Sequence, residues 1–182
     1  IPNGVDISRW DLPEPSMPRS RDELRLMYFG AFGQANGLET LLQAMHELAE
    51  CASAPRVRLR LIGDGPMKPA LESLANDLNL SNVVFENPVT KTEIPSLAAD
   101  ADCFVAVLRD SPLYRYGISL NKIYDYMAAG KPVIFACGAA NNPVAEADAG
   151  ISIAPGDVLA LSDAIDRMAK MHPDDRTKMG QA

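Results

Sequence analysis

The chain has 182 residues, and 17 Lys and Arg against 24 Asp and Glu leave a formal net charge of −7, which argues against a nucleic-acid groove or a broad face for anionic membranes. It shows no run of about 18 apolar residues and no signal peptide, and its odd number of cysteines without metal-ligand spacing indicates reduced thiols, so we expect a cytoplasmic protein without a metal site. One domain of this size buries roughly 70% of the surface that its unfolded chain exposes.

Strand and helix patterns alternate along most of the chain. Residues 1–23 are rich in Pro, Ser and charge and indicate a loosely packed leader. The apolar periodicities then predict strands at 24–29, 57–62, 83–85, 103–108, 133–136 and 151–153. They predict helices at 38–52, 67–78, 92–100, 120–129, 143–149, 159–171 and 173–179. This alternation predicts an α/β fold with a Rossmann-like parallel sheet and helices on both faces, which binds ligands beyond the carboxyl ends of its strands.

The most informative stretch is YGISLNKIYDYMAAGKPVI, from Tyr116 to Ile134. Ser119 is a candidate cap for a helix whose first turn carries Lys122, and Asp125 follows three residues later on nearly the same face. Free N–H groups, the helix dipole and a lysine favour phosphate, and a carboxylate can accept hydrogen bonds from a vicinal diol. A nucleotide presents both groups.

A second candidate is the glycine-rich turn after the first predicted strand. Gly30, Gly33 and Gly37 would let backbone N–H groups approach an oxygen-bearing ligand, although such turns also occur for purely structural reasons.

Four segments in the same order resemble a known family. Ile1-Pro-Asn-Gly-Val-Asp6, Leu61-Ile-Gly-Asp-Gly-Pro66, Ala101-Asp-Cys-Phe-Val105 and the Met-Ala-Ala-Gly-Lys-Pro-Val-Ile run resemble the C-terminal, nucleotide-sugar-binding domain of GT-B glycosyltransferases of the large fourth sequence family. The subgroup most similar in character builds bacterial surface polysaccharide, such as O-antigen or capsule, with N-acetylfucosamine-type donors.

The resemblance implies roles for single residues. The loop at 87–90, with Val89, corresponds to the one that lines the base, and Asp125 to the acid associated with the ribose hydroxyls. The family's donor-sugar acid falls on Gly117. An Arg and a Lys usual in the glycine turn are replaced by Ala31 or Gly33 and by Asn36. Recognition of the diphosphate then depends on Asn36, Lys122 and the backbone near Ser119, Leu120 and Asn121, with Lys122 stabilising the leaving group.

By the same resemblance, residues 1–23 end the connection between two domains and 24–182 form the donor domain. We expect transfer of a sugar from UDP to a hydroxyl acceptor, with retention, without a metal or other cofactor, in lipopolysaccharide or related synthesis. The acceptor, expected to be a lipid-linked saccharide at the inner membrane face, and the catalytic residues would belong to an N-terminal half, so this chain alone should be inactive. Two alternatives stay open: half of a nucleotide-sugar 2-epimerase, which sugar epimerisation without acceptor would reveal, and a non-catalytic nucleotide-binding module, which would turn over no donor.

Overall fold

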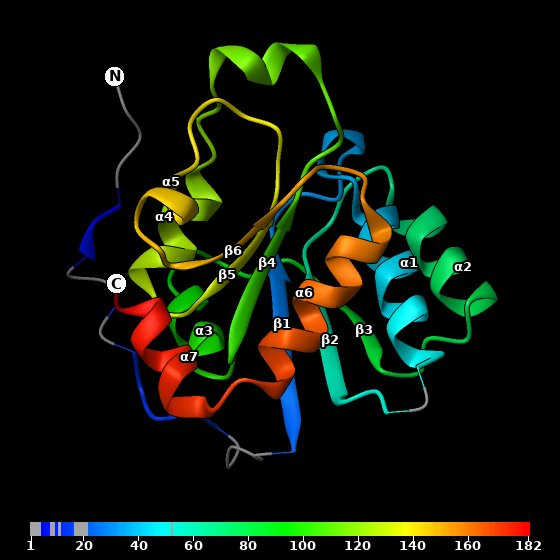
Figure 1. The fold of residues 1–182 in the computed structure, drawn as a ribbon, viewed down its shortest axis with the longest axis horizontal. Helices are drawn as coiled ribbons and strands as arrows, with labels where there is room; N and C mark the ends of the chain where they lie inside the picture. The colour runs from blue at the N-terminus through cyan, green and yellow to red at the C-terminus, as the bar shows by residue number, and fades with distance from the viewer. Residues whose placement is uncertain (1–4, 8–9, 11, 17–21, 52) are drawn as a thin grey trace.

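The protein is described here by a computed structural model, which covers residues 5–7, 10, 12–16, 22–51 and 53–182. Its centre is a six-stranded, wholly parallel sheet with the order β3-β2-β1-β4-β5-β6 (Figure 1). The strands are β1 (Glu23–Phe29), β2 (Arg56–Ile62), β3 (Val83–Glu86), β4 (Cys103–Val107), β5 (Val133–Ala136) and β6 (Gly150–Ile153). The order reverses between β1 and β4, and the crevice at such a reversal is where parallel sheets bind ligands.

Helices cover both faces of the sheet (Figure 1). The helices are α1 (Leu38–Ala49), α2 (Lys68–Asp77), α3 (Ile94–Ala99), α4 (Asn121–Ala128), α5 (Pro143–Glu146), α6 (Val158–Lys170) and α7 (Pro173–Gly180), with short 3-10 turns η2 (Gln34–Asn36) and η3 (Pro112–Tyr116). One buried cluster joins α1, α2 and α6 to the sheet, and the other joins α3, α4 and α5 to the opposite face. The predicted fold class is therefore confirmed.

The apolar pattern explains these layers. Every side chain of β4 is buried, as expected of a central strand covered on both faces. α6 buries Leu161, Ala164, Ile165 and Met168 at helical spacing, and the Asp157 carboxylate caps it by accepting from the Ala160 N–H (2.9 Å). The observed element boundaries lie within three residues of the predicted ones.

The two central strands separate before they end. β1 pairs with β4 only at Leu26 and Met27, so the backbone of Phe29 on that edge has no ladder partner. The buried hydroxyl of Tyr126 on α4 replaces the missing strand, because it accepts from the Phe29 N–H and donates to the Phe29 carbonyl, each at 3.0 Å. The two strands can therefore separate while the buried N–H and carbonyl of Phe29 keep their hydrogen bonds.

Part of the predicted leader lies outside the described residues. Of the described part, Trp10 and Leu12 pack against the cluster that contains α3 and α4, and Ser16 donates to the Asp100 carboxylate through its N–H and its hydroxyl. Among the described residues, no helix is both long and apolar enough to cross a membrane.

Candidate functional site

The glycine turn after β1 packs against the first turn of α4. Gly30 has φ +148°, a backbone conformation that residues with a side chain rarely adopt. A Cβ at this position would stand 3.3 Å from both Lys122 Nζ and the Tyr28 hydroxyl. A side chain at this position would therefore push the lysine away, so the glycine makes room for the ammonium group.

Lys122 closes a ring of hydrogen bonds with this turn. Its Nζ donates to the Tyr28 hydroxyl (2.8 Å) and to Asn36 Oδ1 (2.7 Å). Tyr28 and Asn36 in turn both donate to the Ala31 carbonyl, at 2.7 and 2.9 Å. The ammonium also lies 4.5 Å from the centre of the Tyr28 ring. Burial lowers the pKa of Lys122 to about 8.

The start of α4 corrects one prediction. The residue that caps the helix is Leu120, with no side-chain capping bond, and the exposed Ser119 precedes it. The predicted capping role of Ser119 is wrong because the helix begins one residue later than the pattern suggested. Asn121 and Lys122 are thus the first two helical residues, and their N–H groups have no acceptor within the helix.

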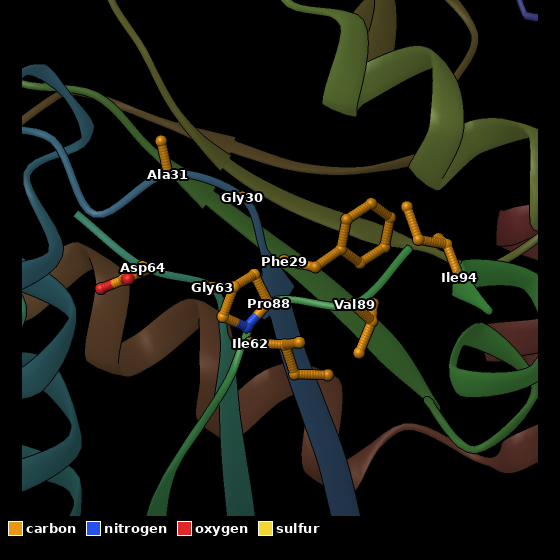
Figure 2. Close-up of a pocket in the computed structure, with 9 residues that line it drawn as sticks. All are labelled: Phe29, Gly30, Ala31, Ile62, Gly63, Asp64, Pro88, Val89 and Ile94. Carbon is orange, nitrogen blue, oxygen red and sulfur yellow. The ribbon is translucent and has the colours of Figure 1, made fainter. Parts of the chain in front are cut away.

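A cavity of about 240 Å³ lies beside this ring, at the carboxyl ends of β1, β2 and β3 (Figure 2). Its wall is mainly apolar, with Phe29, Val89 and Ile94 lying close together in Figure 2. The remaining lining residues are Gly30, Ala31, Ile62, Gly63, Asp64 and Pro88. Because Gly30 lines the cavity and a Cβ built on it would stand 3.3 Å from Lys122 Nζ, the ammonium lies next to the cavity.

Asp125 lies one turn further along α4 and is partly buried. Burial raises the pKa of its carboxyl, and the nearby Lys91 opposes part of that rise. Lys91 belongs to the same connection between β3 and α3 that places Val89 in the cavity. Asp125 is thus close enough to that connection for the Lys91 charge to act on its carboxyl, while Lys122 bonds the residues of the glycine turn.

Other predicted residues are less central. Gly33 precedes η2 with an ordinary φ of −94°, and a Cβ there would approach only Asn36. Gly117 has φ +97°, and a Cβ there would stand 3.0 Å from Asn141 Oδ1. The amide of Asn141 also accepts from the Ile118 N–H (2.7 Å) and donates to the Ile118 carbonyl (2.8 Å). A side chain at Gly117 would therefore be strained and would crowd the Asn141 amide.

Sequence reasoning missed three residues of this arrangement: Tyr28, Tyr126 and Asn141. Tyr28 and Tyr126 both sit in apolar runs, where their spacing indicates core and says nothing of their hydroxyl groups. Asn141 stands in a polar turn, and no local pattern reveals that it pairs with a residue 23 positions away.

A parallel α/β sheet with a lysine-bearing helix at its strand reversal is an arrangement found in many nucleotide-binding domains. The sequence model of the Glycosyl transferases group 1 family matches residues 23–171, and the chain belongs to that family. A GDP-mannose-dependent alpha-(1-6)-phosphatidylinositol monomannoside mannosyltransferase from Mycolicibacterium smegmatis is 26% identical over 174 residues. That match covers 91% of this chain and 45% of the relative, so the chain spans less than half of the relative's length.

Solved structures have the same fold. The C-terminal domain of a glycosyl transferase group 1 family protein (LpcC) from Francisella tularensis has a TM-score of 0.72 at 18% identity, covering 98% of this chain and 93% of that one. Anabaena Alr3699/HepE, in complex with UDP and glucose, has a TM-score of 0.73 at 20% identity, covering 98% and 48%. The resemblance to a GT-B glycosyltransferase domain is therefore confirmed.

Proposed function

We propose that this chain is the donor-binding part of a glycosyltransferase, which holds a nucleoside diphosphate sugar, UDP-linked in preference to GDP-linked, for transfer to a hydroxyl acceptor with retention. The observation that carries the proposal is the Lys122 ammonium. Two neutral acceptors hold it over Gly30, and no carboxylate pairs with it among the described residues. A partly buried cation that lacks a counter-ion at a helix N-terminus favours an anionic ligand.

The neighbouring groups fit the rest of a nucleotide. The apolar cavity that shares Gly30 would take the base, with Val89 in its wall. Asp125, one turn beyond Lys122 on α4, would accept hydrogen bonds from the ribose diol. The N–H groups of Asn121 and Lys122 and the third N–H of the ammonium would meet the diphosphate. Lys122 would then stabilise the diphosphate as it leaves.

The proposals for the pathway, the donor sugar and the acceptor are based on the family and on the sequence resemblance described above. The mannosyltransferase relative is GDP-mannose-dependent. A lipopolysaccharide outer core galactosyltransferase has a similar fold, with a TM-score of 0.69. We place this chain in synthesis of bacterial surface polysaccharide, at the cytoplasmic membrane face, with an N-acetylfucosamine-type donor. The acceptor would be a lipid-linked saccharide bound largely by the other half of the protein.

Calorimetric titration tests the assignment. UDP, GDP and uridine are titrated against the parent, Lys122→Ala and Lys170→Ala, a control in which an exposed lysine paired with Asp166 is removed from α6. We expect Lys122→Ala to weaken UDP about tenfold or more and uridine little, because one charge-assisted hydrogen bond to phosphate is lost. Added salt should weaken UDP binding to the parent more than to Lys122→Ala.

The titrations test the diphosphate, base and ribose contacts separately. Equal losses for UDP and uridine would remove Lys122 from the diphosphate site, and tighter binding of GDP than of UDP would overturn the base preference. Adding 2′,3′-dideoxy-UDP and Asp125→Ala tests the ribose contact, since the variant should bind UDP and the dideoxy form almost equally.

A further inference from the structure

We infer that Tyr28 and Asn36 are positioning residues that hold Lys122 as an uncompensated, outward-donating cation, so that anion selectivity at this site depends on two side chains that do not contact the ligand. The inference rests on the proposed function, because the anion is the diphosphate of the donor. It follows from the ring formed by Lys122, Tyr28, Asn36 and the Ala31 carbonyl.

The first step counts donors. An ammonium group has three N–H bonds, and two of those of Lys122 are directed to Tyr28 Oη and Asn36 Oδ1. The third is left for a ligand. Since a lysine side chain otherwise samples many rotamers, fixing two donors also fixes the direction of the third.

The second step concerns charge. Tyr28 is fully buried, with 0% of its surface exposed, and burial raises the pKa of its hydroxyl, so it stays neutral. Asn36 cannot ionise. Other titratable groups of the site are Asp125 on α4 itself and Asp64 in the cavity wall, whose Oδ1 accepts from the Gly65 N–H (2.8 Å). Beside Gly37, at the end of the glycine turn, Glu39 and Arg109 pair with each other. The ring therefore orients the ammonium without cancelling its charge.

The third step concerns the Ala31 carbonyl. It accepts from both Tyr28 and Asn36, which leaves Tyr28 Oη and Asn36 Oδ1 free to accept from the lysine. Hydrogen bonds arranged in sequence polarise one another, so each of the two acceptors binds the ammonium more strongly than it would alone. The same carbonyl ties the lysine to the glycine turn, which keeps the ammonium over Gly30.

Two variants test the inference. Tyr28→Phe keeps the buried ring, its contact with Phe32 and the aromatic face under the ammonium, and removes only the hydroxyl. Asn36→Asp keeps the size of the side chain and places a carboxylate against the ammonium. Lys122→Ala is the reference, and the quantity measured is the ratio of the uridine and UDP dissociation constants at neutral pH.

We expect the ratio of the uridine dissociation constant to the UDP dissociation constant to fall about threefold to tenfold in Tyr28→Phe. In Asn36→Asp this ratio should fall at least as far as it does in Lys122→Ala. NMR titration of the Lys122 side chain measures the pKa of its ammonium group. This pKa should not change if Tyr28 and Asn36 only support the fold. We expect the pKa to fall in Tyr28→Phe, which loses an acceptor for the charged form, and to rise in Asn36→Asp, which gains a carboxylate.

If Tyr28→Phe keeps the ratio and the Lys122 titration of the parent while Lys122→Ala loses the ratio, the inference is overturned and the proposed function stands. If Tyr28→Phe does not fold, Asn36→Asp decides alone, and an unchanged ratio in that variant overturns the inference. A parent without preference for UDP over uridine would instead overturn the proposed function, and the inference with it.

Discussion

The Lys122 ammonium is partly buried, and burial disfavours its charged form. Burial lowers its pKa from the ordinary 10.5 to about 8, so the ammonium form is less stable in the folded protein than in the unfolded chain. The penalty on folding is present below pH 8 and is relieved as the pH rises from 8 towards 10.5. A bound phosphate would remove the same penalty at neutral pH, which couples ligand binding to stability.

Replacement of this lysine should therefore stabilise the unliganded protein. We expect Lys122→Met, which keeps a long flexible side chain without the charge, to raise the Tm at pH 7 by about 2 to 4 °C, a gain of about 1 kcal/mol for a chain of this size. The difference from the parent should shrink at about pH 10, where the parent's lysine is neutral. Differential scanning calorimetry of both proteins at the two pH values measures this, and a Tm difference that does not change with pH would contradict it.

At the scale of elements, the connection before α4 depends on a neighbouring loop. The Asn141 amide forms two hydrogen bonds with the backbone of Ile118, and the Ala140 N–H donates to the Tyr114 carbonyl (3.2 Å). The loop after β5 thus holds the segment that directs the first turn of α4 towards the glycine turn. Asn141 thus holds the backbone that leads into α4.

The adjacent asparagines offer a matched pair of variants. Asn141→Ala should lower the free energy of unfolding by about 1 to 3 kcal/mol and also weaken UDP, because the entry to α4 loses both bonds. Asn142→Ala removes the cap of α5, where Asn142 Oδ1 accepts from the Ala145 N–H (3.1 Å), and should lower stability while leaving the UDP affinity near that of the parent. Equal effects on affinity, measured by calorimetry beside urea unfolding, would show that the bonds between Asn141 and Ile118 have no special role.

These elements also show how far sequence reasoning reaches. Periodicity and turn residues predicted all six strands and the helix that carries Lys122, because those signals are local. The partners of Lys122 are 94 and 86 residues away in the chain, and their contacts depend on strand register and on the backbone at Gly30. Asn36, predicted from the sequence to bind the diphosphate, accepts a hydrogen bond from the lysine, and that bond was not predicted. The capping prediction for Ser119 failed because Leu120 in an extended conformation starts the helix.

For the whole molecule, the candidate site lies at the carboxyl edge of the sheet. The mannosyltransferase relative is more than twice as long as the match, which covers 45% of it. We predict that residues 1–182 bind UDP and transfer no sugar, because transfer requires groups of donor and acceptor sites held in one cleft. Assays of UDP release from UDP-sugars with saccharide acceptors, run beside calorimetry, check this. Glycosylation of an acceptor by residues 1–182 would refute the half-enzyme interpretation.

The hydroxyl of Tyr126 has a consequence for the entropy of binding. By occupying both backbone groups of Phe29, it fastens α4 to the end of β1, and the tyrosine ring stacks on Phe104 with centroids 4.4 Å apart. The helix with the lysine and the strand that leads into the glycine turn therefore move as one body. The proposed diphosphate would therefore find its donors already in place, so little conformational entropy would be lost on binding.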